Sequence, residues 1–135
     1  ALLVNLAFCG NIYWKNASRM NEDKNAVLLI ESKLYPHRIE LVSNTKDTNE
    51  GWTKVWSGTV NHNEFEFKMP TDLRQGRYYA FKLEEGDCSH YTKSLYLSNG
   101  GKWMDPVSEK EGIASDGKKH KNSAQHCAML GIVAA

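Results

Sequence analysis

The chain has 135 residues, about the size of one domain and enough to bury a single hydrophobic core. Its 17 basic residues nearly balance its 16 acidic ones, and the net charge of +1 gives no overall attraction to nucleic acid or to an anionic membrane. No stretch reaches the roughly 18 apolar residues that a membrane-spanning helix needs. We therefore expect one domain over residues 1–135, with no nucleic-acid or membrane partner.

The first ten residues allow two interpretations. An apolar run followed by small residues at Ala7 and Cys9 is typical of the end of a secretory signal peptide. The same run is typical of a first β-strand, because an extended chain would place four apolar residues on one side: Leu2, Val4, Leu6 and Phe8. Residues 1–10 are thus either a signal-peptide remnant or a strand of the fold.

Short apolar or alternating runs then follow at roughly ten-residue spacing. They predict six or seven strands, the clearest at 26–30, 38–42, 52–56, 65–69, 79–83 and 91–97. The polar stretches 16–25 and 43–51 are predicted to be loops, and Ser57-Gly58 a turn. Many short strands without helical periodicity favour an all-β fold, a single antiparallel β-sandwich of immunoglobulin or fibronectin type, with a jelly roll as the alternative.

Two of these runs also predict which side chains point inward. Pro70 ends the first because it has no N–H to donate, and Gly76 provides a positive φ where the chain turns back. The apolar positions on either side of this turn share the period of a strand. We predict that five of them face the core: Phe65, Phe67, Tyr79, Phe81 and Leu83.

Residues 102–135 differ in composition and are predicted to form a loop-rich C-terminal extension. Within it, 115–123 is polar and basic, and reads as an exposed loop carrying Lys118, Lys119 and Lys121. The last residues, 124–135, become apolar again and are predicted to close against the core.

The three cysteines, Cys9, Cys88 and Cys127, allow two redox states. One disulfide with a spare thiol fits a secreted protein, and three buried thiols fit a cytosolic one. Asn16-Ala17-Ser18 is a glycosylation sequon. Together with the signal-like beginning, it favours a secreted glycoprotein.

The clearest family resemblance lies in an ordered set of residues in the second half of the chain. The set is Phe65, Phe67, Pro70, Leu73, Gly76, Tyr78 and Tyr79, followed by Tyr91-Thr92-Lys93-Ser94-Leu95-Tyr96-Leu97-Ser98. It resembles the immunoglobulin-like domain of fungal cell-wall proteins tied to β-1,6-glucan assembly, and of related Ser/Thr-rich anchored surface proteins. This resemblance spans about residues 26–101. It implies secretion and a sandwich, and it supplies no catalytic residues.

No arrangement typical of an active site is found. Cys88 and His90 could pair a thiolate with a base, but no third orienting residue or oxyanion-binding glycine motif accompanies them, and a disulfide at Cys88 is the simpler interpretation. A hydrolase using a carboxylate with His62 or His90 is the least favoured function. We expect no enzyme activity, no metal site and no cofactor.

Tryptophans and lysines are the candidate binding residues. Trp52 and Trp56 are four apart in a predicted strand and would share a face, and with Trp103 they either pack in the core or form a binding surface. The lysines at 118, 119 and 121 are the basic candidates. The sequence therefore predicts a secreted, non-catalytic binding module for cell-wall glycan or for a protein partner. The alternative is a small secreted microbial effector that acts on a host protein.

Overall fold

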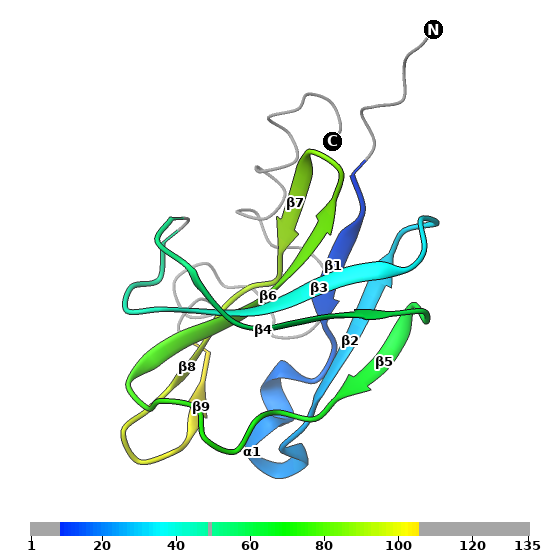
Figure 1. Cartoon of the computed structure of the whole chain (residues 1–135). Coiled ribbons are helices and arrows are strands. Elements are labelled where there is room, and N and C mark those ends of the chain that lie inside the picture. Colours follow the sequence, from blue (N-terminus) through cyan, green and yellow to red (C-terminus); the bar gives the residue numbers. More distant parts are fainter. Residues whose placement is uncertain (1–8, 49, 106–135) are drawn as a thin grey trace, which may run out of the picture.

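The computed structural model describes residues 9–48 and 50–105, which form two antiparallel sheets packed against each other (Figure 1). The smaller sheet has the order β1-β2-β5, formed by β1 (Asn11–Trp14), β2 (Ala26–Glu31) and β5 (Glu64–Phe67). The larger has the order β4-β3-β6-β8-β9, and β7 also pairs with β6. Its strands are β3 (His37–Asn44), β4 (Thr53–Val60), β6 (Arg77–Glu85), β7 (Cys88–Tyr91), β8 (Leu95–Leu97) and β9 (Trp103–Met104).

The strand order shows how the chain passes between the two sheets. The chain changes sheet between β2 and β3, between β4 and β5 and between β5 and β6, whereas β3–β4 and β6–β7 are hairpins within one sheet. The predicted all-β fold, a single antiparallel β-sandwich, is therefore confirmed.

Alternating side chains of both sheets meet in one core. Tyr79, Phe81 and Leu83 are at most 1% exposed, as predicted, while Phe65 and Phe67 are half-buried and pack against this core from the shorter sheet. The ring centroids of Phe67 and Phe81 lie 5.2 Å apart at an interplanar angle of 77°, an edge-to-face contact between the sheets. The inward register predicted for these strands is thus correct.

The predicted loop 16–25 is wrong in part. It contains a 3₁₀ turn (Ala17–Arg19) and one turn of helix, α1 (Met20–Asp23), which Figure 1 shows near the end of β1 and the start of β2. Met20 is 1% exposed and belongs to the core. A single helical turn is too short to show a 3.6-residue period. The apolar Met20 within a polar stretch was the one sign of it in the sequence.

The predicted turn at Ser57-Gly58 is also wrong, because β4 runs through it to Val60. Gly58 lies within the strand because the Trp56 indole leaves no room for a side chain at this position. A Cβ at this position would lie 2.6 Å from the Trp56 indole, so the ring two residues earlier occupies the space above the glycine.

Two strand boundaries differ from the prediction. The run 91–97 is not one strand, because its ladder with β6 is interrupted between β7 and β8. At this break the Thr92 hydroxyl oxygen accepts the Phe81 N–H at 3.0 Å, and the hydroxyl donates to the Lys93 carbonyl at 2.8 Å. At the other boundary, Ser43 and Asn44 belong to β3 rather than to the loop that follows.

Both predicted terminal segments lie mostly outside the described residues, at 1–8 and 106–135. Their described parts are held by the domain. Cys9 forms a disulfide with Cys88, with their Cα atoms 6.0 Å apart, and the Gly10 N–H donates to the Glu85 carboxylate at 2.8 Å. Trp103 and Met104 pair with β8 as β9. None of the helices in the described part is long and apolar enough to cross a membrane.

Candidate functional site

A cleft of about 470 Å³ opens between the inner face of the larger sheet and the segment that joins β5 to β6. The strands contribute polar and aromatic side chains and the segment contributes Pro70 to Arg74. Its lining residues are Ser43, Thr53, Val55, Trp56, Pro70, Asp72, Leu73, Arg74, Arg77 and Tyr79. The cleft lies at the Thr53 end of β4, which is an edge strand of the sandwich.

Two guanidinium groups line this cleft. Arg77 Nε donates to the hydroxyl of Ser43 at 2.9 Å, and Ser43 is itself only 3% exposed. Within the described residues, neither Arg74 nor Arg77 has a carboxylate oxygen within the 4.0 Å of an ion pair. Asp72 lines the same cleft without pairing to either arginine. The cleft therefore combines two positive charges with one negative charge and favours an anionic group.

A hydrogen bond across the β5–β6 corner positions these arginines. The Tyr79 hydroxyl, near the start of β6, donates to the carbonyl of Arg74 at 2.7 Å. This is the arrangement called the tyrosine corner in immunoglobulin-like sandwiches. Gly76 completes the corner with φ +75°, and its N–H donates to the Leu97 carbonyl at 2.6 Å. The backbone that carries Arg74 and Arg77 is thus tied to the sheet on both sides of the turn.

The predicted tryptophan pair is split between the two faces of the larger sheet. Leu41 pairs with Trp56 but Val42 pairs with Lys54, so Val55 is the extra residue of a β-bulge. The bulge reverses the alternation, which puts Trp56 on the inner face and Trp52 on the outer one. Trp56 packs against the core, 4.8 Å from the Phe67 ring. The prediction that Trp52 and Trp56 share a face is wrong.

Trp52 packs on the outer face of the sheet with Tyr91 from β7. The two ring centroids are 6.4 Å apart although three strand spacings separate β4 from β7, so both side chains reach across Val42 and Ala80. Val42 and Ala80 are buried although they lie outside the inter-sheet core. The Trp52 indole N–H donates to the Thr48 carbonyl at 2.9 Å. Trp52 is therefore engaged within the fold.

The same outer face carries Lys82, a charged lysine that is paired with two carboxylates. Lys82 Nζ lies 3.0 Å from a carboxylate oxygen of Glu84, 3.9 Å from Glu40 and 5.8 Å above the Tyr91 ring centroid. Burial lowers the pKa of Lys82, but the hydrogen bond to Glu84 and the electrostatic contributions of Tyr91, Glu84 and Glu40 outweigh it, so its pKa is raised. This charge is already balanced within the sheet.

Of the remaining predicted binding residues, the structure describes Trp103 but not the three lysines. Trp103 packs against the core, with its ring 5.8 Å from that of Tyr79. Lys118, Lys119 and Lys121 lie outside the described residues, so they remain predicted contacts. Of the three predicted candidates that the structure describes, Trp52, Trp56 and Trp103, only Trp56 lines the cleft.

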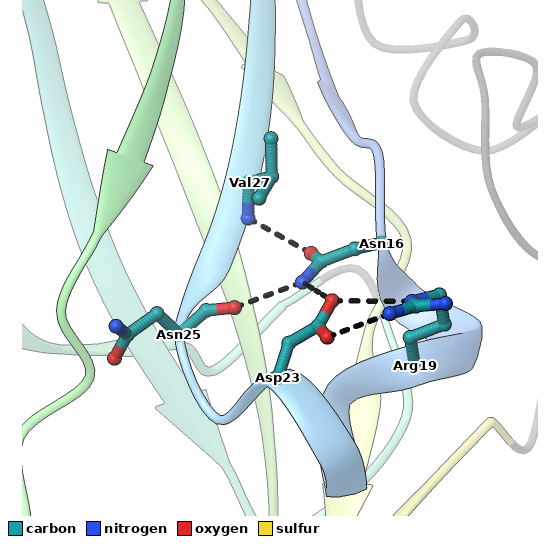
Figure 2. A network of polar contacts seen from close by, with 5 residues as sticks. All are labelled: Asn16, Arg19, Asp23, Asn25 and Val27. Carbon is teal, nitrogen blue, oxygen red and sulfur yellow. Dashed lines mark hydrogen bonds and ion pairs between the residues drawn. The ribbon is translucent and has the colours of Figure 1, made fainter.

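The glycosylation sequon coincides with a buried polar network (Figure 2). Asn16 is 6% exposed, and its amide group donates to the Asn25 carbonyl at 2.8 Å and to Asp23 at 3.0 Å, while its oxygen accepts the Val27 N–H at 2.8 Å. A glycan on this amide nitrogen would break the network that ties α1 to β2. The folded domain does not present Asn16 for glycosylation.

Asp23 completes this network at the surface. Hydrogen bonds from Arg19 and then from Asn16 hold the pKa of its carboxyl group below the ordinary value of 3.8. The Arg19 guanidinium lies 3.1 Å from the carboxylate, one helical turn earlier in the chain (Figure 2). The charged form of Asp23 is therefore part of the native structure.

Two of the three residues considered for catalysis, Cys88 and His90, have structural roles. Cys88 is in the disulfide, so it offers no thiolate. His90 is buried, and its Nδ1 accepts the Ile12 N–H at 3.1 Å, which places the ring proton on Nε2. His62 is exposed on the β4–β5 connection. Across residues 9–48 and 50–105, no three His, Cys, Asp or Glu side chains gather as metal ligands would.

Comparison with known proteins returned no matching family model, no similar curated protein and no similar solved structure. The site must therefore be interpreted from its own geometry. The residues that sequence reasoning missed are Arg74 and Arg77. They flank Gly76 in the motif Leu-Arg-Gln-Gly-Arg-Tyr-Tyr, which signalled the turn but not the charge it presents.

Proposed function

We propose that this chain is a secreted, non-catalytic binding module whose cleft takes an acidic group of a protein partner. The observation that carries the proposal is the pair Arg74 and Arg77, which line one cleft with no carboxylate within ion-pair distance among the described residues. Guanidinium groups recognise carboxylates with two parallel hydrogen bonds, which gives geometric specificity as well as affinity.

The cleft is preorganised for such a ligand. Arg77 is half-buried and its Nε is already held by Ser43, so little side-chain freedom is lost when its outer nitrogens bind. Trp56 and Leu73 provide an apolar wall beside the charges, as protein-interface pockets commonly do.

A protein ligand is favoured over a neutral wall glycan. Sugar binding by stacking commonly uses several exposed aromatic faces, but only one of the three described candidate tryptophans, Trp56, lines the cleft. Trp103 packs against the core and Trp52 packs on Tyr91. The resemblance to fungal cell-wall domains supports secretion without requiring a sugar ligand. The Cys9–Cys88 disulfide also supports secretion, because such bonds persist in oxidising compartments. A protein ligand equally suits the microbial effector that the sequence suggested.

The test compares ligands of both classes by isothermal titration calorimetry. The probes are acetyl-Gly-Glu-Glu-Gly-amide, its Gln-Gln counterpart and trigalacturonate, an acidic sugar. The wild-type protein is expected to bind the Glu-Glu peptide, and Arg74→Gln and Arg77→Gln to weaken that binding about ten-fold or more, since hydrogen bonds to charged groups contribute about 1.5–3 kcal/mol.

Arg38→Gln is the matched control, because Arg38 is an exposed arginine on the outer face of the same sheet. It should bind the peptide as the wild type does. Equal binding of the Glu-Glu and Gln-Gln peptides would reject an acidic ligand. Preferential binding of trigalacturonate would replace the protein partner with an acidic glycan.

A further inference from the structure

Within residues 9–48 and 50–105, no strand pairs with the outer edge of β4, the edge strand beside the cleft. β4 has eight residues and is the first strand of the larger sheet, with β3 as its only sheet neighbour in the described part of the chain. Successive residues of an edge strand point their N–H and C=O groups alternately toward the neighbouring strand and toward the free edge. The groups at the free edge can therefore pair with another strand.

Natural edge strands are usually blocked against unwanted pairing by bulges and charges. In β4 these devices are confined to one half. The bulge at Val55 and the charge of Lys54 lie toward the Thr53 end, where the cleft opens. The other half, Ser57 to Val60, is regularly paired with β3 and carries neither a charge nor a bulge. This half is the part of the edge that can pair with an incoming strand.

We propose that the partner segment binds as an added β-strand along Ser57–Val60 and that an acidic side chain next to this strand enters the cleft. The proposal rests on the function proposed above and identifies how the partner binds. Main-chain hydrogen bonds would provide affinity for the segment, and the arginine cleft would provide specificity for its acidic side chain. Strand addition commonly combines these two contributions.

Distance and charge agree with this assignment. Val55 and Trp56 line the cleft and directly precede the pairing half, Ser57–Val60. An extended chain advances about 3.4 Å per residue. A partner paired with Ser57–Val60 therefore places a residue over the cleft about two to four positions beyond its paired stretch. Arg74 and Arg77 make the cleft at this end of β4 positive, against Asp72 alone among the acidic residues that line it. The occupant is therefore an extended peptide with β-forming residues followed by Glu or Asp.

The test uses the peptide acetyl-Thr-Val-Thr-Val-Ser-Glu-Glu-amide with the intact protein. Two further peptides carry N-methyl groups on alternate residues of the Thr-Val-Thr-Val stretch, one set in each phase. Only one phase points its N–H groups at β4, so one methylated peptide should bind at least about ten-fold more weakly and the other should bind like the parent. Backbone amide exchange of Ser57–Val60 should slow when the parent peptide is bound.

The outcomes separate this inference from the proposed function. If both methylated peptides bind like the parent and binding still depends on Arg77, strand addition is wrong and the acidic cleft stands. Loss of binding in both phases, without slower exchange in β4, also rejects strand addition. If neither the parent nor acetyl-Gly-Glu-Glu-Gly-amide binds at millimolar concentration, the cleft and the added strand are both rejected.

Discussion

Replacing Asn16 by alanine tests the buried network that joins α1 to β2. Its amide group satisfies the Asn25 carbonyl and the Val27 N–H, each at 2.8 Å. Alanine would leave both backbone groups without that partner, at a cost of about 1–3 kcal/mol for each buried group. Water at the neighbouring surface offsets part of this, and the contact with half-exposed Asp23 adds little. We therefore expect Asn16→Ala to lower the free energy of unfolding by about 2–4 kcal/mol.

Urea unfolding followed by tryptophan fluorescence measures this loss. Asn61→Ala is the matched control, because Asn61 is exposed on the β4–β5 connection, and it should change stability by less than about 0.5 kcal/mol. An Asn16→Ala loss as small as that of the control would refute the structural role of the amide. Mass spectrometry of the folded protein secreted from a eukaryotic host should also find Asn16 unmodified, and a glycan there would contradict the network directly.

Three further predictions concern stability. Gly58→Ala places a methyl group 2.6 Å from an indole carbon and should cost about 1–3 kcal/mol, whereas Gly100→Ala, with its nearest atom 3.9 Å away, should be nearly neutral in the same denaturation assay. Replacing both Cys9 and Cys88 by serine opens a loop of sequence separation 79 and should cost about 2–4 kcal/mol, a difference that a reducing agent should remove. The pKa of Asp23 is held below 3.8 by the neighbouring guanidinium, so its contribution to stability is present above that pH and is lost as the pH falls through the folded-state pKa. Asp23→Asn should flatten the stability profile below about pH 4, and an unchanged profile would show that the carboxylate is not stabilised in the fold.

The parts of the fold that follow period-two patterns were predictable from the sequence. The alternation of Phe65 with Phe67 and of Tyr79 with Phe81 determines which face is buried, because a strand has only two faces. The features that the sequence did not predict depend on contacts between distant residues. Gly58 resembles a turn residue until the Trp56 indole is seen above it, and no local pattern reveals that packing.

The candidate site depends on such non-local geometry. One bulged residue, Val55, separates Trp52 from Trp56 and so decides which tryptophan can line the cleft. Arg77 is held in the cleft by its hydrogen bond to Ser43, which is 34 positions away in the chain. The two residues meet only because β3 pairs with β6. Residue type alone indicated aromatic and basic contacts, and the fold determined which of them converge.

The most direct test of the acidic cleft is a nuclear magnetic resonance titration that follows side-chain nitrogens. As acetyl-Gly-Glu-Glu-Gly-amide is added to the wild-type protein, we expect saturable shifts of the Arg74 and Arg77 guanidinium signals and of the Trp56 indole N–H. The Arg38 guanidinium signal should stay unchanged. Shifts spread evenly over exposed arginines, or confined to Trp52 on the outer face, would contradict the account.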